Sequence, residues 1–404
     1  MISDTYRIKY RVFAILTGAA AVGLIFFLPG RSIEVRNDPV RSSLVEVGMG
    51  FAPSGASETS NGADIGPQEQ LAEPPKVVKA VYLTGWSGGN EAKIQEVINL
   101  SRAGKINAVV IDIKDFSGET FLFPRPNALI KRLHDQGIYV IARLAVFQDQ
   151  VLTKARPELA VKSINLSQSV TVSDDIWRDR KGLAWIDPAA SASWDYNIKI
   201  AKDAWERGFD EINLDYIRFP TDGDLNDRLF PVWDGKRLMS LVMKEFFKTI
   251  RGELPEAVLS VDLFGLAAVT YYDFGVGQMI EDAYEYFDFV SPMLYPSHFP
   301  LSFLGPPVQS SISAEPQYKR PAEHPYEVVR QSMDAAIFRL ENRPGSRVAL
   351  RPWLQDFDLG ADYDEEKVRV QIQAVIDSFG GPESEGYRGF MLWNPANVYT
   401  KEAL

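Results

Sequence analysis

The segment GFDEINLDYIRFPTDG, residues 208–223, decides the fold, because an apolar run in it leads into charged residues. Side chains alternate between the two faces of a strand. Asn213, Asp215 and Ile217 therefore share one face, and Leu214 and Tyr216 share the other. In a barrel of parallel strands the active site lies at the carboxyl ends of the strands. The segment thus predicts a barrel strand that presents Asp215 at the barrel mouth.

Seven further runs have the same character, with apolar residues first and polar or aromatic residues at the end. They are VKAVYLTG (78–85), AVVIDIKD (108–115), YVIARLAVF (139–147), LSVDLFGL (259–266), FVSPMLYP (289–296), VALRPWLQ (348–355) and GFMLWNP (389–395). Amphipathic helical stretches such as 91–104 and 237–254 separate them. This alternation is typical of an α/β protein with a parallel sheet, and eight strands predict a (β/α)8 TIM barrel over residues 77–404.

Composition narrows the classes of ligand. The formal charge of −11 argues against nucleic acid, because phosphate binding requires clustered Lys and Arg, and it suits neutral or cationic ligands better. The sequence has no cysteine, which excludes thiolate metal sites, and only three histidines are available for catalysis or metal binding by imidazole. There is no glycine-rich phosphate loop and no HExxH motif. We therefore expect no cofactor and no metal site; the oligomeric state stays open.

The amino terminus predicts a membrane anchor ahead of the barrel. Residues 12–29, VFAILTGAAAVGLIFFLP, carry no charge and are just long enough to span a hydrocarbon core of ~30 Å. They predict a transmembrane helix between a cytoplasmic tail (1–11) and a flexible linker (30–76). A cleaved signal peptide is the alternative, and the basic residues on the two sides nearly balance. The expected location is the cell membrane, single-pass, with the barrel extracytoplasmic.

Strand alternation also predicts which polar side chains line the barrel mouth. It directs Asp112 and Lys114 inward from run 108–115, and Arg143 inward from run 139–147. The remaining runs contribute Asp262, Tyr295, Arg351, Trp353 and Gln355. Burial of an unpaired charge costs roughly several kcal/mol. Asp112 is therefore expected to pair with Lys114, or Asp215 with Arg143.

Paired carboxylates and aromatic rings suit the cleavage of a glycan. Glycoside hydrolysis uses two carboxyl groups on either side of the scissile bond. Asp215 is the expected nucleophile or base and Asp262 the expected general acid, with Asp112, Lys114 and Arg143 as substrate-binding residues. Aromatic rings offer flat faces to sugars, and the substrate-binding candidates among them are Tyr295, Trp353 and Trp393.

The region from Val78 to Trp393 resembles the DUF4015 family of glycosyl hydrolase-type barrels. The matching signatures are AVYLTGW, NAVVIDIKDFSGE, VIARLAVFQD, WIDPAA, GFDEINLDYIRFPTDG, FVSPMLYPSH and GFMLWNP. The resemblance implies that Asp215 is the catalytic carboxylate. The fourth strand is also similar to the DxxDxDxE motif of chitinases of glycoside hydrolase family 18, but Ile217 replaces the glutamate that donates the proton there. The chitinase mechanism therefore does not transfer.

These observations lead to a leading hypothesis and a rival. The first is a membrane-anchored glycoside hydrolase that cleaves an extracytoplasmic or cell-envelope polysaccharide by carboxylate catalysis. The rival is a non-catalytic surface barrel that binds carbohydrate. A deacetylase or lyase ranks last, because neither a set of metal ligands nor a tyrosine and base pair is evident.

Overall fold

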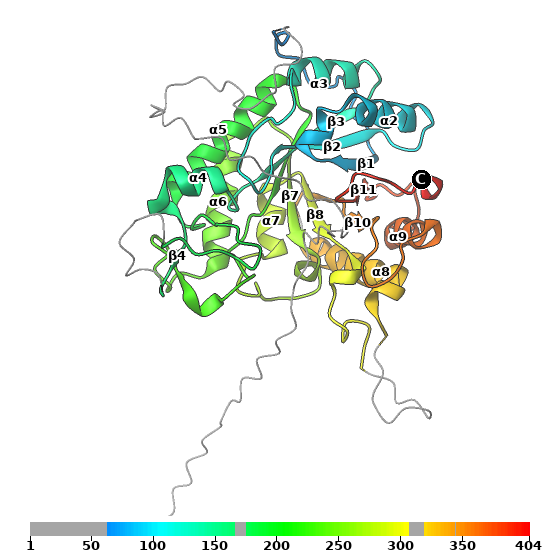
Figure 1. Ribbon diagram of the computed structural model, residues 1–404. Helices are drawn as coiled ribbons and strands as arrows, with labels where there is room; N and C mark the ends of the chain where they lie inside the picture. Colours follow the sequence, from blue (N-terminus) through cyan, green and yellow to red (C-terminus); the bar gives the residue numbers. More distant parts are fainter. Residues whose placement is uncertain (1–62, 166–174, 307–318, 344) are drawn as a thin grey trace, which may run out of the picture.

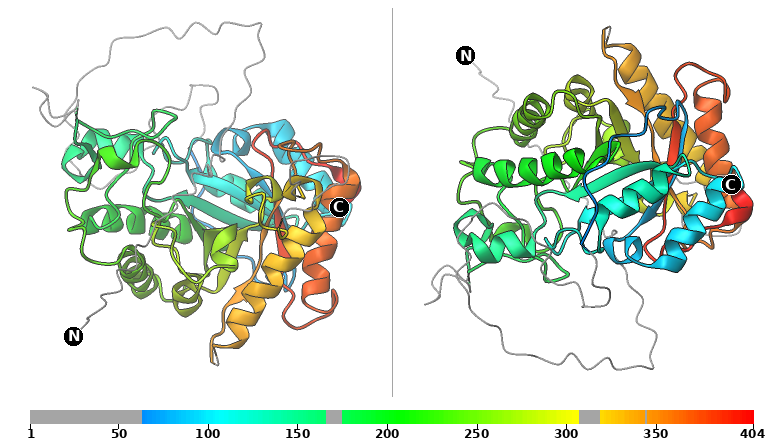
Figure 2. Two further views of the ribbon diagram at one scale, coloured as in Figure 1. Left: turned by 90° about the horizontal axis from the view of Figure 1, so that it is seen from below. Right: turned by 90° about the horizontal axis from the view of Figure 1, so that it is seen from above.

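The computed structural model describes residues 63–165, 175–306, 319–343 and 345–404. In this part of the chain, strands lie at the centre and helices surround them (Figure 1). Two further views show the same arrangement from below and above (Figure 2). The predicted tail (1–11) and anchor (12–29) lie outside the described residues. Among the residues that the structure describes, no helix is long and apolar enough to cross a membrane.

All eight predicted strands are present in one parallel sheet. They are β1 (Val78–Leu83), β2 (Ala108–Lys114), β3 (Tyr139–Ala145), β5 (Glu211–Asp215), β7 (Leu259–Phe264), β8 (Phe289–Met293), the interrupted pair β9 (Ala349–Leu350) and β10 (Trp353–Gln355), and β11 (Gly389–Trp393). Neighbours in the sheet follow the order β10-β11-β1-β2-β3-β5-β7-β8-β9. A pairing between Trp353 of β10 and Met293 of β8 closes the barrel. The predicted (β/α)8 barrel is confirmed.

The helices that cover the barrel alternate with the strands. They are α1 (Gly85–Gly88), α2 (Glu91–Arg102), α3 (Pro126–His134), α4 (Gln150–Ala155), α5 (Ser191–Arg207), α6 (Met239–Glu253), α7 (Ile280–Tyr286), α8 (Pro325–Glu341) and α9 (Glu365–Ser378). Local sequence sets several of their ends. The Asp364 side chain accepts a hydrogen bond from the backbone N–H of Lys367 at the start of α9. Gly208, at φ 100°, ends α5 in the left-handed conformation that glycine adopts without strain.

Two separate cores hold these layers together. The larger lies between strands and helices and includes Val109, Leu144 and Phe246. The smaller fills the barrel interior and includes Ala80, Val110 and Trp353. Strands that are buried on both faces need apolar residues at nearly every position, which explains the continuous apolar runs in the sequence.

Long connections on the carboxyl side of the strands add a small second sheet. Strand β4 (Lys162–Ser163), in the insertion after β3, pairs antiparallel with β6 (Arg228–Leu229), in the connection after β5. The two insertions therefore support each other beside the barrel mouth. Residues 166–174 of the first insertion and 307–318 of the connection after β8 lie outside the described part.

The last residues of the predicted linker lie against the barrel. The Asp64 carboxylate accepts hydrogen bonds from the backbone N–H groups of Asn127 and Ala128, at 2.9 and 3.1 Å, and so caps α3. Leu71 donates its N–H to Asp210 at 2.6 Å and packs against the interior core. The expectation of a flexible linker is therefore wrong for residues 63–76. Side-chain capping and burial of an apolar residue fix this segment, although its composition resembles that of a free linker.

Candidate active site

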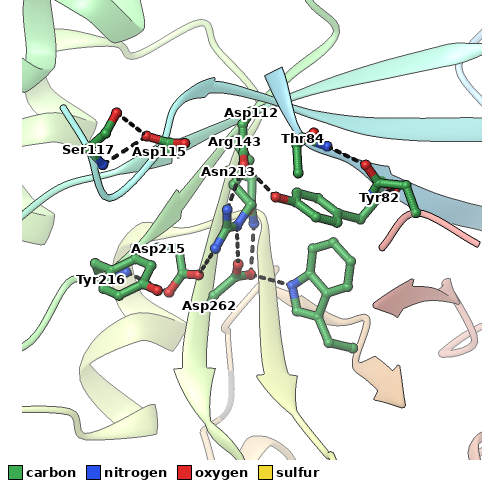
Figure 3. Close-up of polar contacts among 12 residues, drawn as sticks. Tyr82, Thr84, Asp112, Asp115, Ser117, Arg143, Asn213, Asp215, Tyr216 and Asp262 are labelled. Carbon is green, nitrogen blue, oxygen red and sulfur yellow. Dashed lines mark hydrogen bonds and ion pairs between the residues drawn. The ribbon is translucent and has the colours of Figure 1, made fainter. Parts of the chain in front are cut away.

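Four charged side chains meet at the carboxyl ends of four neighbouring strands. Asp112 comes from β2, Arg143 from β3, Asp215 from β5 and Asp262 from β7 (Figure 3). The register of the sheet explains the convergence, because Asp112 lies beside Arg143 and Arg143 beside Asn213. Four predicted site residues are therefore brought together.

The guanidinium of Arg143 is the centre of the cluster. Its Nη1 donates to Asp112 Oδ1 at 2.6 Å, its Nη2 donates to Asp215 Oδ2, and its Nε lies 3.8 Å from Asp262 Oδ2. The rings of Tyr82 and Trp393 lie 5.4 and 4.8 Å from the guanidinium carbon. One buried positive charge thus faces three carboxyl groups. Three buried carboxylates around a single cation would repel one another, so protonation of at least one is favoured.

Asp262 is the carboxyl group that this arrangement keeps protonated. It is 1% exposed, and burial raises its pKa well above the ordinary value, with a further increase from the charge of Asp215. Its Oδ1 accepts hydrogen bonds from Asn213 Nδ2 at 2.9 Å and Trp353 Nε1 at 2.8 Å. Because both donors occupy Oδ1, the proton of the neutral acid belongs on Oδ2, on the side of Arg143.

Asp215 has the opposite surroundings. One oxygen accepts from Arg143, and the other accepts from the backbone N–H of Tyr216 at 2.5 Å. Both donors stabilise a negative charge on this carboxylate. Asp215 is 8% exposed, compared with 3% for Asp112 and 1% for Asp262. It is therefore the carboxylate of the three that solvent reaches most readily.

Asp112 forms the third side of the cluster. The hydroxyl of Tyr82 donates to its Oδ2 at 2.5 Å, opposite the bond from Arg143 to Oδ1. Burial raises the pKa of Asp112 to about 6, although Arg143 opposes this shift. Asp112 therefore orients Arg143 and Tyr82 and changes its charge in the mildly acidic range.

The predicted aromatic residues divide into two roles. Trp353 is 1% exposed and donates its indole N–H to Asp262, so it positions the acid and does not offer a face to a ligand. Trp393 is partly exposed and stacks on Tyr82 with ring centroids 4.0 Å apart. Tyr295 is buried, and the charges of Asp262 and Asp215 add to the effect of burial in raising its pKa. Trp393 is thus the predicted aromatic best placed to contact a substrate.

Lys114 lies elsewhere. The pairing of β2 with β3 shifts by one residue between Asp112 and Lys114, so that Lys114 lies opposite Leu144. This bulge turns Lys114 to the outer face, where it forms a fully buried ion pair with Asp149 at 2.6 Å. Its ammonium group lies 5.2 Å from the ring of Tyr196 on α5. The prediction that Lys114 points into the mouth and pairs with Asp112 is wrong, because strict alternation fails at a bulge.

Two other residues that were predicted to point into the barrel mouth lie away from the carboxylate cluster. Arg351 is buried and forms an ion pair with Glu211, at the first residue of β5 and away from Asp215. Gln355 bonds to Ser297 and to Gln371 of α9. Both stabilise the barrel and take no part in the carboxylate cluster.

Tyr82 and Asn213 complete the site but were not among the predicted site residues. Tyr82 bonds to Asp112, and Asn213 joins Asp262 to Ser260. Alternation in VKAVYLTG and EINLD places both on the inner face, so this signal was available in the sequence. Within the described residues, no group of three or more His, Asp or Glu side chains could hold a metal ion.

An open hollow lies on the loops that follow β2 and β3. Its volume is about 680 Å³, within the ~300–1,000 Å³ typical of small-molecule sites. Ser117 in its wall bonds to Asp115, three residues beyond Asp112. The lining residues are Ser117, Glu119, Gln150, Val151, Lys154 and Ala155.

Comparison with known proteins gives one family over most of the chain. Residues 80–399 match DUF4015, described as "Putative glycosyl hydrolase domain". No curated protein matches at the sequence level.

Among solved structures, a hypothetical protein from Ruminiclostridium thermocellum is 38% identical, over 45% of this chain and 96% of its own, with a TM-score of 0.40. The glycoside hydrolase domain of PelA from Pseudomonas aeruginosa is 13% identical, over 80% of this chain and 96% of its own, with a TM-score of 0.40. An α-galactosidase from Thermus thermophilus is 15% identical, over 83% of this chain and 65% of its own, with a TM-score of 0.48. The assignment of a family rests on the match over residues 80–399.

Proposed function

The chain belongs to the DUF4015 family of glycosyl hydrolase-like domains, and from this premise we propose that it is a glycoside hydrolase with Asp215 and Asp262 as its catalytic pair. The observation that carries the proposal is the contrast between these two groups around Arg143. Asp215 accepts two charge-stabilising hydrogen bonds, whereas burial raises the pKa of Asp262. Two carboxyl groups with opposite protonation are what acid-assisted glycoside cleavage requires.

The roles follow from these surroundings. Asp262 holds a proton on Oδ2 and is suited to protonate the leaving oxygen. Asp215, more exposed and held as an anion, is suited to attack the anomeric carbon or to activate a water molecule. Both contact one guanidinium, so their carboxyl groups lie close together. A separation of ~5–5.5 Å would make the enzyme retaining, and one of ~6.5–9.5 Å would make it inverting. Proton NMR of the first sugar anomer released distinguishes the two.

The location of the substrate is part of the same proposal. The apolar run 12–29 supports an anchor in the cell membrane, and the length of the following domain supports its export. The enzyme would then act on an extracytoplasmic or cell-envelope polysaccharide. Protease added to intact cells should degrade the barrel; a barrel that stays intact while the same protease cleaves it after lysis contradicts this location.

A second function is favoured by one observation. Arg143 occupies an oxygen of Asp215, and the three carboxyl groups of the cluster are all buried. Such a cluster would also suit a barrel that binds a glycan without cleaving it. The two functions separate in one experiment, in which a panel of cell-envelope polysaccharides is incubated with the protein for long periods. Release of new reducing ends identifies a hydrolase, whereas binding without any product identifies the carbohydrate-binding barrel.

A further inference from the structure

Arg218 lies beside the carboxylate cluster on the same side of the barrel. It follows Asp215 by three residues, and its guanidinium carbon lies 4.6 Å from the ring of Trp185 and 4.8 Å from the ring of Phe264. Phe264 is the last residue of β7 and follows Asp262 by two residues. The guanidinium is therefore held between two aromatic rings next to the ends of the strands that carry the catalytic pair.

This guanidinium forms no ion pair with any residue in the described parts of the chain. Its Nη1 bonds to the Phe219 carbonyl at 3.4 Å and to Thr221 Oγ1 at 3.3 Å. Both are long bonds, and both leave Nε and Nη2 for another acceptor. The side chain is partly exposed, so a ligand can reach it. The rings fix the plane of the guanidinium and hold its free edge in one orientation.

The carboxylates around Arg218 are each engaged by other donors. Asp215 accepts from Arg143, Asp222 is paired with Arg180 at 3.5 Å, and Asp179 accepts from Gln148 and from the indole of Trp185. Burial lowers the pKa of Arg218, whereas the nearby Tyr216, Asp215, Asp179 and Asp222 oppose that shift. An anionic ligand would replace the long contacts of Arg218 to neutral acceptors with a direct, charge-assisted hydrogen bond.

We propose that Arg218 recognises an anionic group on the sugar, a carboxylate, sulfate or phosphate, so that the substrate is an acidic glycan. That the acidic glycan is a substrate rests on the proposed function, but binding of an anion at Arg218 does not require hydrolysis. The planar edge of a guanidinium matches two oxygens of such a group at once. Of the two rings, Trp185 is buried and only holds Arg218, whereas Phe264 is partly exposed and offers a surface to the sugar ring beside it.

The overall charge of −11 does not oppose this assignment. Charges separated by more than the Debye length, ~8 Å at physiological ionic strength, are largely screened, so the local charge decides. Lys181 lies in the same insertion as Trp185, and burial together with the charge of Arg218 lowers the pKa of Lys181, so a second cation lies near Arg218. The expectation from composition that neutral or cationic ligands suit the protein applies to the surface as a whole and not to this position.

Titration of the ¹⁵N-labelled protein with small probes tests the proposal directly. The probes are glucuronate, glucose 6-sulfate, glucose 6-phosphate and glucose. Binding is monitored through the indole N–H signal of Trp185, which is assigned with a Trp185→Phe variant. At least one anionic probe should shift this signal and bind about 10- to 100-fold more tightly than glucose, the range for a charge-assisted pair. The preference among the three anions identifies the group. Equal affinity of the wild type for glucose and all three anions overturns the proposal.

Variants separate recognition from a packing role. Arg218→Gln should abolish the preference for the anion, and Arg330→Gln, which removes an equal charge from an exposed pair on α8, should keep it. If Arg218→Gln does not fold, Arg218→Lys is compared, and it should retain only part of the preference because it lacks the fork. An anion preference that survives in a folded Arg218 variant contradicts the assignment. Hydrolysis by Asp215→Asn is measured separately, so loss of the anion site and loss of catalysis remain distinguishable.

Discussion

At the scale of single residues, the site depends on the protonation of Asp262, which shares Arg143 with Asp215. Burial and the charge of Asp215 both raise the pKa of Asp262. A general acid must be protonated, so activity should be present below the pKa of Asp262 and be lost as pH rises through it. The alkaline limb of the pH profile therefore belongs to Asp262.

Trp353 sets the position of that alkaline limb. Its indole N–H bonds to Asp262 Oδ1 at 2.8 Å and stabilises the ionised form. In Trp353→Phe the pKa of Asp262 should rise further, so the alkaline limb of kcat/KM should move to higher pH. Trp194→Phe removes a buried indole N–H that bonds to Pro188, away from the site, and serves as the control. A limb at the same pH in Trp353→Phe and wild type would remove Trp353 from this role.

Asp112 should make stability depend on pH. Its pKa is raised to about 6 in the folded protein. The contribution of protonated Asp112 to the unfolding free energy is therefore fully present below the pKa that Asp112 has in the unfolded chain. It is lost as pH rises through about 6. A shift of two pKa units corresponds to ~3 kcal/mol.

The unfolding free energy should thus fall between pH 4 and pH 7 in the wild type and fall less in Asp112→Asn. Denaturant unfolding across this pH range measures the difference. Asp135→Asn, at an exposed position on the surface, should keep the slope of the wild type. Equal slopes in Asp112→Asn and wild type would show that Asp112 does not titrate as described.

At the scale of elements, the sequence predicted the eight strands but not the irregularities that aim their side chains. Apolar runs bounded by polar residues were sufficient to locate every strand, because strands buried on both faces require them. Alternation then placed Asp112, Arg143, Asp215 and Asp262 correctly on the inner face. It failed for Lys114, where a bulge adds a residue, and for Ile217, which lies in the outer core. Tyr216, at φ 53°, turns the chain directly after β5, and no pattern in a single sequence announces that turn.

The bulge in β2 creates a buried ion pair whose partners depend on each other. In Asp149→Asn the amide can still cap α4, but Lys114 is left as a buried charge without its counterion. We expect a loss of ~3–5 kcal/mol in unfolding free energy. The double variant Lys114→Met with Asp149→Asn should recover much of that loss, as chemical denaturation of the set will show. Additive losses would mean that the two groups are not coupled.

At the scale of the whole molecule, residues 63–76 belong to the folded barrel. Their composition favoured a linker. The contacts that hold them are made to residues far along the chain, such as Asn127 and Asp210, and patterns in a single sequence do not show such distant partners. A truncated chain that begins at residue 77 should melt a few degrees below one that begins at residue 63, roughly 2–4 °C per kcal/mol lost. Identical melting temperatures would show that this segment adds no stability.

The family, the closed barrel and the carboxylate cluster support one account, in which Asp215 and Asp262 cleave a glycosidic bond beside Arg143. The measurement that tests it most directly is the rate at which reducing ends are released from a cleaved polysaccharide by wild type, Asp215→Asn and the control Asp135→Asn. All three must show the same far-ultraviolet circular dichroism spectrum. The account predicts that Asp135→Asn matches the wild type and that Asp215→Asn loses activity by roughly 10²-fold or more. Undiminished release by a folded Asp215→Asn would contradict it.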